Sequence, residues 1–238
     1  MSSRPRIVLV IPALDEEQAL PAVLQELEPF RSSLLDEILV VDNGSQDRTA
    51  AIARQAGATV LHEPQHGYGA ACLRALEHLR AAPPDVVVFM DADRSDDPSD
   101  LPSLLRPILE GDCELVIGSR TRGADPGALL PQARFGNWLA TGIIRRRHGF
   151  RYSDLGPFRA MRFAALERLQ LRDRDFGWTV EMQVRALQEG LRITEVPVRY
   201  HRRVGRSKIS GSLRGSMRAG SKILATLWRL RRSPQPRP

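Results

Sequence analysis

The segment RIVLVIP, residues 6–12, is a continuous apolar run rich in β-branched residues. A strand with one face in water alternates apolar and polar residues, so an unbroken run predicts a strand buried on both faces. Similar runs recur along the first half of the chain, and they predict further strands at 37–42, 58–61, 85–91 and 114–118. The first half of the chain is therefore expected to be organised around a buried sheet.

Segments with helical periodicity separate these runs. Between residues 16 and 30, apolar side chains recur at three- and four-residue intervals, at Ala19, Leu20, Val23, Leu24 and Leu27. Further helices are expected at 49–55, 67–81 and 101–109. Alternating strands and helices predict an α/β, Rossmann-like fold, a mostly parallel sheet with helices on both faces. Ligands in such folds bind beyond the carboxyl ends of the strands.

The alternation ends after residue 120. Glycine and proline residues predict a loop at 121–131. In the rest of the chain we expect two helices, at 135–147 and 178–188, and two strands, at 156–161 and 193–198. We therefore expect one domain over 1–212, followed over 213–238 by a basic amphipathic helix and a disordered tail.

The composition excludes several classes of protein. The two cysteines, Cys72 and Cys113, are too few for a four-cysteine zinc site and do not suggest a disulfide framework. No signal peptide and no run of about 20 apolar residues is visible, so we expect a cytoplasmic protein, either soluble or bound to the inner face of the cell membrane. The first strand is not followed by a glycine-rich turn, which argues against an NAD or FAD enzyme.

The net charge of +7 is unevenly distributed. Residues 199–238 contain twelve Lys or Arg and no Asp or Glu, which leaves 23 basic and 28 acidic residues in the other 198. Such a basic segment attracts phosphate groups of a nucleic acid, a lipid headgroup or a diphosphate substrate. Its aromatic residues are limited to Tyr200 and Trp228, so the interleaving typical of nucleic-acid binding is missing and we expect no nucleic-acid partner. A non-catalytic basic module that binds nucleic acid or membrane stays as an alternative.

Acidic residues follow two of the expected strands. Asp91 and Asp93 lie one residue apart at the end of the strand 85–91, where both carboxylates can reach one hard cation. Mg²⁺ or Mn²⁺ prefers oxygen ligands and commonly takes one or two carboxylates together with phosphate oxygens. Asp42, at the end of the strand 37–42, is placed to accept hydrogen bonds from a base or ribose. The alternative in both places is that these side chains only form turns.

Eight short segments occur in a characteristic order: IPALDEE (11–17), VVDNGSQDRT (40–49), HGYGAA (66–71), FMDADRSDDP (89–98), IGSR (117–120), SDLGPFRAMR (153–162), FGWTVEMQVRA (176–186) and RRVGRSK (202–208). In this order and spacing they resemble the family 2 glycosyltransferases of the GT-A fold. More narrowly, they resemble the dolichyl- and polyprenyl-phosphate mannose or glucose synthases. The resemblance implies a metal-dependent transfer of a hexose from a UDP- or GDP-linked sugar, with polyprenyl phosphate at a membrane surface as the expected acceptor.

The resemblance also assigns roles to residues. On the donor side, the residues implied to line the nucleotide, its diphosphate and the metal are Pro12, Leu14, Glu16, Asp42, Asp91, Ala92 and Asp93. Asp91 and Asp93 are the implied ligands of Mg²⁺ or Mn²⁺, and Asp93 has the more direct part in the reaction. Arg202 and Lys208 match the basic loop that covers the donor. Ser95 departs from the glutamine that is frequent at this position in the lipid-phosphate synthases.

On the acceptor side, Arg120 and Arg134 match arginines near the diphosphate and the acceptor phosphate, and Asp154 and Glu181 match acidic positions. A phosphate acceptor needs no general base, whereas an alcohol would need one, for which Glu181 or Asp154 is the candidate. The alternative for Glu181 is that it holds a basic side chain in place. A sugar nucleotidyltransferase is the rival enzyme class, although such enzymes usually carry a glycine-rich basic loop after the first strand.

Overall fold

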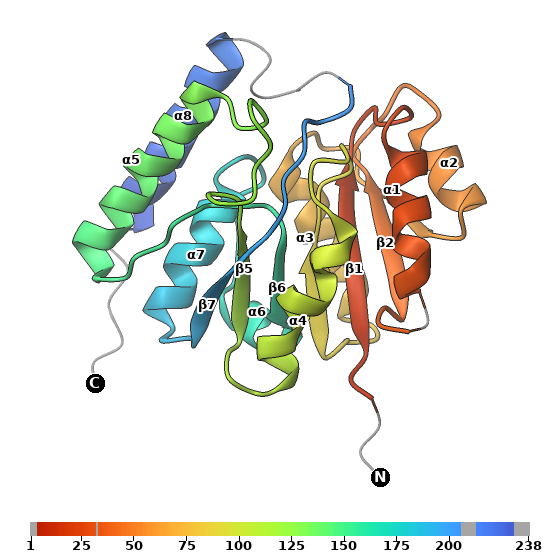
Figure 1. Cartoon of the computed structure of the whole chain (residues 1–238), viewed down its shortest axis with the longest axis horizontal. Coiled ribbons are helices and arrows are strands. Elements are labelled where there is room, and N and C mark those ends of the chain that lie inside the picture. Colours follow the sequence, from red (N-terminus) through yellow and green to blue (C-terminus); the bar gives the residue numbers. More distant parts are fainter. Residues whose placement is uncertain (1–3, 32, 206–212, 231–238) are drawn as a thin grey trace.

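The protein forms a seven-stranded sheet with helices on both faces, as Figure 1 shows for this computed structural model. The structure describes residues 4–31, 33–205 and 213–230. The strands lie in the order β3-β2-β1-β4-β6-β5-β7. Their bounds are Ile7–Ala13 for β1, Glu37–Asp42 for β2, Thr59–His62 for β3, Val86–Phe89 for β4, Leu115–Ser119 for β5, Arg159–Arg162 for β6 and Ile193–Pro197 for β7. The predicted α/β class with a mostly parallel sheet is confirmed.

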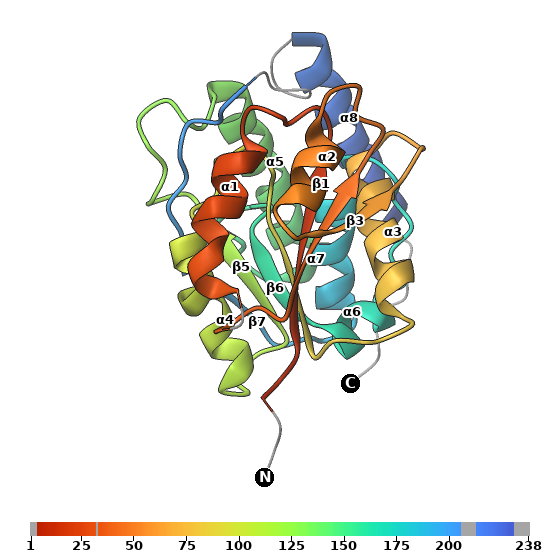
Figure 2. The ribbon, with the colours of Figure 1, turned by 90° about the vertical axis from the view of Figure 1, so that its right-hand side faces the viewer.

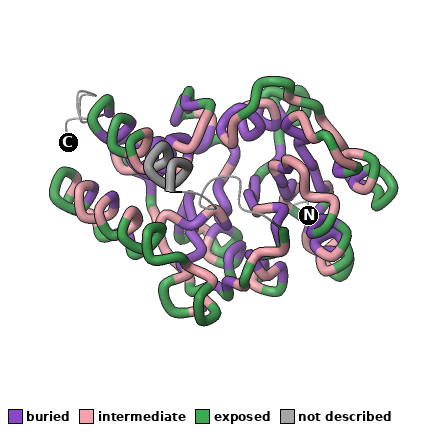
Figure 3. The backbone as a smooth tube through the Cα atoms, turned by 90° about the horizontal axis from the view of Figure 1, so that it is seen from above, coloured by how far each residue is buried: buried purple, intermediate pink, exposed green. Residues whose placement is uncertain are grey.

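The helices form a layer on each side of the sheet. Their bounds are Leu20–Leu27 for α1, Thr49–Gln55 for α2, Tyr68–Leu79 for α3, Leu101–Leu109 for α4, Pro131–His148 for α5, Phe163–Arg168 for α6, Trp178–Gln188 for α7 and Leu213–Leu230 for α8. In Figure 2, α1 and α4 lie on one side of the sheet and α3 and α6 on the other. Figure 3 shows buried residues concentrated between the layers and exposed residues on the outer sides of the helices.

Successive residues of β1 supply both cores. Val8 and Val10 pack with α3 and α7, whereas Ile7, Leu9 and Ile11 pack with α1 and α4. Side chains of a strand alternate between its faces, so a strand covered on both sides must be apolar throughout. This requirement explains the continuous apolar runs of the sequence.

One strand breaks the parallel arrangement. β6 lies antiparallel between β4 and β5, with Ala160 opposite both Val88 and Val116. The sequence predicts a strand here, but an apolar pattern does not show whether a strand runs parallel or antiparallel to its neighbours. Because β6 separates β4 from β5, the two parallel parts of the sheet are joined through it alone.

Several predicted helices differ from the observed ones at their ends. The helix expected over 16–30 is α1 followed by a 3₁₀ turn at Glu28–Phe30, because Pro21 occupies the first turn of α1 and residues 16–19 form a separate turn. The helix expected from residue 135 begins at Pro131, since proline suits the first turn of a helix. The short helix α6 was not predicted, because six residues are too few to show a helical period.

The C-terminal helix α8 packs on the rest of the chain. Leu227 and Leu230 are buried in the core that includes α3 and α7. Arg147 of α5 donates a hydrogen bond to the carbonyl oxygen of Leu227 at 2.8 Å, and Gln188 of α7 donates to that of Leu230 at 3.1 Å. In the part of the chain that the structure describes, no helix has the length and apolar character needed to cross a membrane. The expected disordered tail, SPQPRP at 233–238, lies outside the described residues.

The start of α3 touches the loop 172–177 backbone to backbone. A Cβ atom added to Gly67 or Gly69 would overlap the carbonyl oxygens of Arg174 and Asp173, respectively. The amide of Ala70 also donates to the carbonyl oxygen of Arg174 at 2.9 Å. Glycine is therefore required at Gly67 and Gly69 by close packing, and this contact places the loop beside the carboxyl ends of the strands.

We expect the substitution Gly69→Ala to lower the free energy of unfolding by about 1–3 kcal/mol, because the added methyl group overpacks a contact between two backbones. Gly136→Ala is the matched control, since a Cβ at Gly136 in α5 meets no atom within 4 Å. This second change should raise the free energy of unfolding by about 0.5–1 kcal/mol through helix propensity. Urea unfolding measures both, and equal effects of the two substitutions would contradict the packing argument.

Candidate functional site

The carboxylates that follow β4 form the centre of the site. Asp93 is almost fully buried, and one of its oxygens accepts hydrogen bonds from the amide and the hydroxyl of Ser95. Its other oxygen lies 2.8 Å from the guanidinium of Arg203. The amide of Asp91 donates to Asp96 at 3.1 Å, which folds the chain into a tight turn. Asp91 and Asp93 are thereby held side by side beyond the end of the strand.

This cluster carries more negative charge than its buried setting favours. Burial and the neighbouring Asp93 raise the pKa of Asp91 to about 7, although Arg203 and Arg120 oppose the shift. Burial and Asp91 raise the pKa of Asp96 well above its usual range. One carboxylate oxygen of Asp96 is buried and has no hydrogen-bond partner within the described ranges. Oxygen donors with excess negative charge fit a hard divalent cation.

The described residues hold no group of three or more His, Cys, Asp or Glu side chains arranged around one point. Asp91 and Asp93 can therefore supply a metal with two carboxylates, and its other ligands would be phosphate oxygens of a substrate and water, the usual arrangement for Mg²⁺.

A cavity of about 380 Å³, which we call the donor cavity, opens at the carboxyl ends of β1, β2 and β4. Six residues assigned to the donor side line it, namely Pro12, Leu14, Glu16, Asp91, Ala92 and Asp93. Asp42 is not among the lining residues. Its carboxylate accepts from the amide of Ser45 at 3.1 Å and lies 3.2 Å from a ring nitrogen of His62. The structure thus places Asp42 at the base of a turn behind the cavity.

Asn43, the residue after Asp42, lines the donor cavity. It was not among the site residues expected from the sequence. Its side-chain amide donates to the carbonyl oxygens of Glu63 and Gln65 at 3.1 and 2.7 Å, and its oxygen accepts from the amide of Gly67 at 2.8 Å. An aspartate lacks the two donors that these contacts use. Asn43 therefore fixes the loop that carries His66 over the cavity.

A second cavity of about 470 Å³ lies beside the first, and we call it the acceptor cavity because Arg120, expected on the acceptor side, lines it. Its polar side includes Arg120, Arg202 and Arg203, and its apolar side includes Leu129, Leu130, Ala133, Leu155, Val180 and Ile223. Four described residues line both cavities: Tyr68, Asp91, Phe176 and Arg203. The two cavities thus adjoin beside the acidic cluster. Of these four, sequence reasoning selected Asp91 alone.

Asp154 is fully occupied by Arg120. The two side chains form a bidentate pair, with nitrogen–oxygen distances of 2.7 and 2.8 Å, and Asp154 also accepts from the amide of Arg120 at 2.8 Å. Burial would raise the pKa of Asp154, but the Arg120 guanidinium outweighs burial and holds that pKa below its usual range. The guanidinium also lies 4.9 Å from the ring centre of Tyr200. Through these contacts Asp154 positions the Arg120 side chain.

Glu181 lines neither cavity, although the sequence made it a candidate base. One of its oxygens accepts from the amides of Arg172 and Asp173 at 3.0 and 2.7 Å, and the other pairs with Arg185 at 3.0 Å. Glu181 is almost fully buried. Its contacts hold the loop 172–177, which carries Phe176 to both cavities, and the pair with Arg185 matches the alternative role of holding a basic side chain.

The remaining predicted basic residues are Arg202, Arg134 and Lys208. Arg202 donates to the carbonyl oxygen of Pro126 at 2.7 and 3.0 Å. Arg134 lines a third cavity of about 490 Å³, which it shares with Arg120 and Asp154. Lys208 lies outside the described residues.

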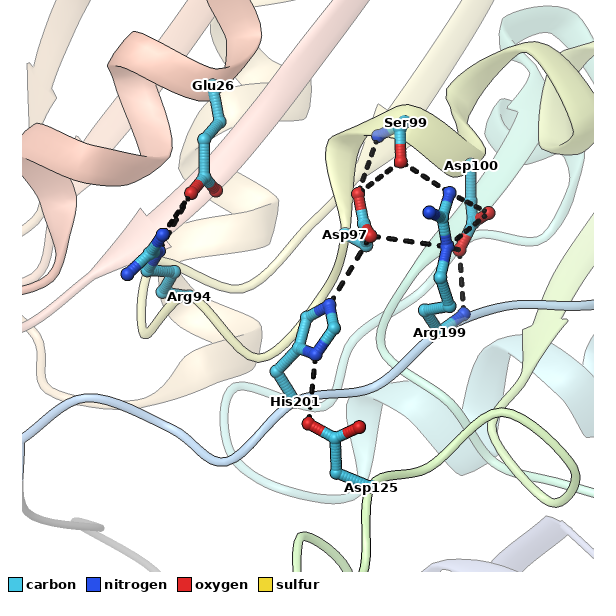
Figure 4. A network of polar contacts seen from close by, with 8 residues as sticks. All are labelled: Glu26, Arg94, Asp97, Ser99, Asp100, Asp125, Arg199 and His201. Atoms are coloured by element: carbon cyan, nitrogen blue, oxygen red, sulfur yellow. Dashed lines mark hydrogen bonds and ion pairs between the residues drawn. The ribbon is translucent and has the colours of Figure 1, made fainter.

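The segment 199–205 that follows β7 runs alongside the acidic cluster. The amides of His201 and Val204 donate to the carbonyl oxygens of Ser95 and Asp93 at 2.7 and 2.9 Å. Figure 4 shows the His201 ring between Asp97 and Asp125, at 3.3 and 3.0 Å. The hydrogen bond to Asp125 raises the pKa of His201, and the hydrogen bond to Asp97 raises it by a smaller amount.

Arg199 adds a second attachment of this segment, because it pairs with Asp97 and Asp100 (Figure 4). The basic segment is therefore fastened to the loop after β4 by Arg199 and His201, and to the loop 121–130 by His201. This explains why its arginines reach the site from the far end of the sequence.

Comparisons with known proteins agree with this geometry. Residues 8–170 match the model of glycosyl transferase family 2. An uncharacterized glycosyltransferase of Mycobacterium tuberculosis is 40% identical over 214 residues, which cover 89% of this chain and 93% of the relative. An undecaprenyl-phosphate mannosyltransferase of Micrococcus luteus is 32% identical over 222 residues, which cover 88% of this chain and 90% of the relative.

Among solved structures, glucosyl-3-phosphoglycerate synthase of Mycobacterium tuberculosis is similar in fold. Its complex with Mn²⁺, UDP-glucose and phosphoglyceric acid superposes with a TM-score of 0.78 at 25% identity, covering 97% of this chain and 81% of the synthase. Its complex with Mg²⁺ and UDP gives a TM-score of 0.75 at 25% identity, covering 97% and 80%. The metals of these complexes agree with the Mg²⁺ or Mn²⁺ expected from the sequence. The sheet, the acidic turn after β4 and the family match lead to one conclusion: this chain is a family 2 glycosyltransferase of the GT-A fold.

Proposed function

We propose that this glycosyltransferase moves a hexose from a UDP-linked sugar to the phosphate of a polyprenyl phosphate at a membrane surface. The observation that supports it most strongly is the pair of cavities that adjoin at Asp91 and Arg203. A transfer reaction needs two substrates whose reacting atoms meet, and these two residues line both spaces.

The donor cavity suits a nucleotide diphosphate sugar. Pro12 and Leu14 offer an apolar surface to the base, and Asp91 and Asp93 would hold the metal. A divalent metal there would offset the negative charge that develops on the departing nucleoside diphosphate. UDP is our choice of nucleotide because the similar synthase structures contain UDP or UDP-glucose. A nucleotidyltransferase would instead release pyrophosphate.

The acceptor cavity suits a phosphate joined to an apolar chain. Asp91 and three arginines line it together, and leucine, valine and isoleucine side chains form much of the remaining wall. The mannosyltransferase of Micrococcus luteus is named for an undecaprenyl phosphate acceptor. In the proposed step a phosphate oxygen forms a bond to the anomeric carbon while the bond from that carbon to the nucleoside diphosphate breaks. The phosphate is already anionic near neutral pH and needs no general base, which is compatible with the occupied carboxylates of Asp154 and Glu181.

The exposed apolar side chains support a membrane surface as the site of action. Six large hydrophobic residues are exposed in the described part of the chain, and five lie on α5, just before it, or on α8: Leu130, Phe135, Trp138, Leu224 and Trp228. The two helices pack on each other. Three exposed arginines, Arg145, Arg146 and Arg147, end α5. Aromatic and basic residues on packed helices favour an anionic lipid surface.

The proposed function predicts that purified protein, a UDP-hexose and polyprenyl phosphate yield UDP and a lipid-linked hexose when Mg²⁺ or Mn²⁺ is present. Chelator and Asp93→Asn should each abolish transfer. They should also abolish the rise in Tm with UDP, which at about 100 times the Kd is about 5–10 °C for a chain of this size. Asp112→Asn is the matched control, because Asp112 is exposed between α4 and β5 and lines neither cavity. Hexose transfer to phosphoglyceric acid but not to the lipid would replace the proposed acceptor, and release of pyrophosphate would replace the reaction class.

We expect Glu181→Gln to act on stability more than on chemistry. The amide side chain keeps the size of glutamate but loses charged hydrogen bonds to two backbone amides and Arg185, which lowers the free energy of unfolding by about 1–3 kcal/mol. The shape of the kcat–pH profile should be unchanged. A drop in kcat of about 10²–10⁴-fold, without loss of stability, would instead identify Glu181 as a general base.

Membrane docking predicts that replacing Trp138 and Trp228 by alanine weakens binding to vesicles that contain anionic lipid by at least about tenfold, since burying a large apolar side chain contributes about 1.5–3 kcal/mol. Leu109→Ser is the control, because Leu109 is also exposed but ends α4. Vesicle co-sedimentation measures both variants. Equal binding of the double variant and the wild type would rule out this surface as the docking site.

A further inference from the structure

We propose that Arg203 exchanges partners during the reaction, binding Asp93 in the donor-free enzyme and the acceptor's phosphate once metal and donor are bound. This inference rests on the proposed function and adds to it the residue that couples the two cavities. The sequence motif pointed instead to its neighbour Arg202, which is carried on the same segment.

The backbone around Arg203 is fixed, whereas its side chain can rotate. The backbone on its flanks is anchored by the amides of His201 and Val204, which donate to carbonyl oxygens of the acidic turn. The guanidinium reaches Asp93 at 2.8 Å, and its side chain keeps 33% of its surface exposed. Among the described residues that line both cavities, Arg203 carries the positive charge. Small rotations of this side chain can therefore carry its charge from one cavity to the other.

The other arginines near the cavities have partners that are not expected metal ligands. Arg120 forms a bidentate contact with Asp154, which is not one of the expected metal ligands. Arg159 is fully buried and donates to the carbonyl oxygens of Gly156, Pro157 and Thr179. Arg202 donates to the carbonyl oxygen of Pro126. Arg203 differs from all three, because its partner Asp93 is one of the two carboxylates that a divalent cation would use.

Charge balance then gives the direction of the exchange. While Asp93 is free of metal, Arg203 compensates its charge, and this pair opposes metal binding. When a divalent cation shares Asp93, the guanidinium faces a second positive charge and its hold on that carboxylate weakens. A phosphate in the adjoining acceptor cavity offers a partner that matches the planar guanidinium with two hydrogen bonds. Acceptor binding and donor binding should therefore favour each other, by the same factor in both directions.

The experiment compares Arg203→Gln with wild type in two measurements. The first is Mn²⁺ titration of the donor-free protein, followed by electron paramagnetic resonance, and here the variant should bind Mn²⁺ several-fold more tightly because the competing cation is gone. The second is steady-state kinetics with a UDP-hexose and polyprenyl phosphate. The KM for the acceptor should rise by about 10–100-fold, the effect of losing a charged hydrogen bond, while the KM for the donor changes less.

Two further variants control for folding and for charge. Arg74→Gln removes an arginine of α3 that pairs with Glu77 and lines neither cavity, and it should leave both measurements unchanged. Arg203→Lys keeps the charge without the planar fork, so its acceptor KM should lie between those of wild type and Arg203→Gln. If Arg203→Gln fails to fold, the acceptor KM of Arg203→Lys tests the exchange alone, because lysine keeps the cation that competes with Mn²⁺.

The outcomes separate this inference from the proposed function. Unchanged Mn²⁺ affinity in Arg203→Gln, or an unchanged acceptor KM in an active enzyme, overturns the exchange of partners. If wild type transfers no hexose to polyprenyl phosphate, the proposed function fails instead, and the Mn²⁺ titration still decides whether Arg203 competes with metal. A rise in the donor KM equal to that for the acceptor would place Arg203 on the donor diphosphate and also overturn the proposal.

Discussion

Negative charge gathered at the end of β4 is the constraint that organises this molecule. Asp91, Asp93 and Asp96 lie within one tight turn, and burial raises the pKa of Asp91 and Asp96 because a buried carboxylate loses its hydration. Positive charge must come from outside the turn. Arg203 supplies it from the segment after β7 and Arg120 from the end of β5. A substrate with a metal and a diphosphate enters a site whose electrostatics already suit both.

The loop 172–177 depends on contacts of a different kind. Glu181 accepts hydrogen bonds from two of its amides, and the glycines of α3 allow it to approach backbone to backbone. Asp173 accepts from Thr226 and Arg229 of α8 at 3.2 and 3.1 Å, so the C-terminal helix is attached to the same loop. Phe176, which lines both cavities, is therefore positioned by α3, α7 and α8 together. Glu181, a candidate base in the sequence, makes contacts in the structure that hold this loop.

Much of the fold and the centre of the site could be predicted from the sequence. An unbroken apolar run indicates a buried strand, and ligands bind beyond the carboxyl ends of such strands. The acidic turn at Asp91 and Asp93 was found in this way. The antiparallel direction of β6 was not, since an apolar pattern is the same read in either direction. Arg203 and Asn43 were missed for another reason. Their importance lies in contacts with Asp93 and with the loop 63–67, and spacing along the chain does not encode such partners.

The place of β6 also has a consequence for biosynthesis. β4 and β5 are made early, yet neither pairs with the other, and the strand that joins them comes only at Arg159–Arg162. As the chain leaves the ribosome, β1 to β4 can assemble while one edge of β4 stays open, with its backbone amides and carbonyls unpaired. An open apolar edge invites pairing with another chain. The interval between the synthesis of β4 and that of β6 is thus a period in which the nascent protein carries an edge open to aggregation.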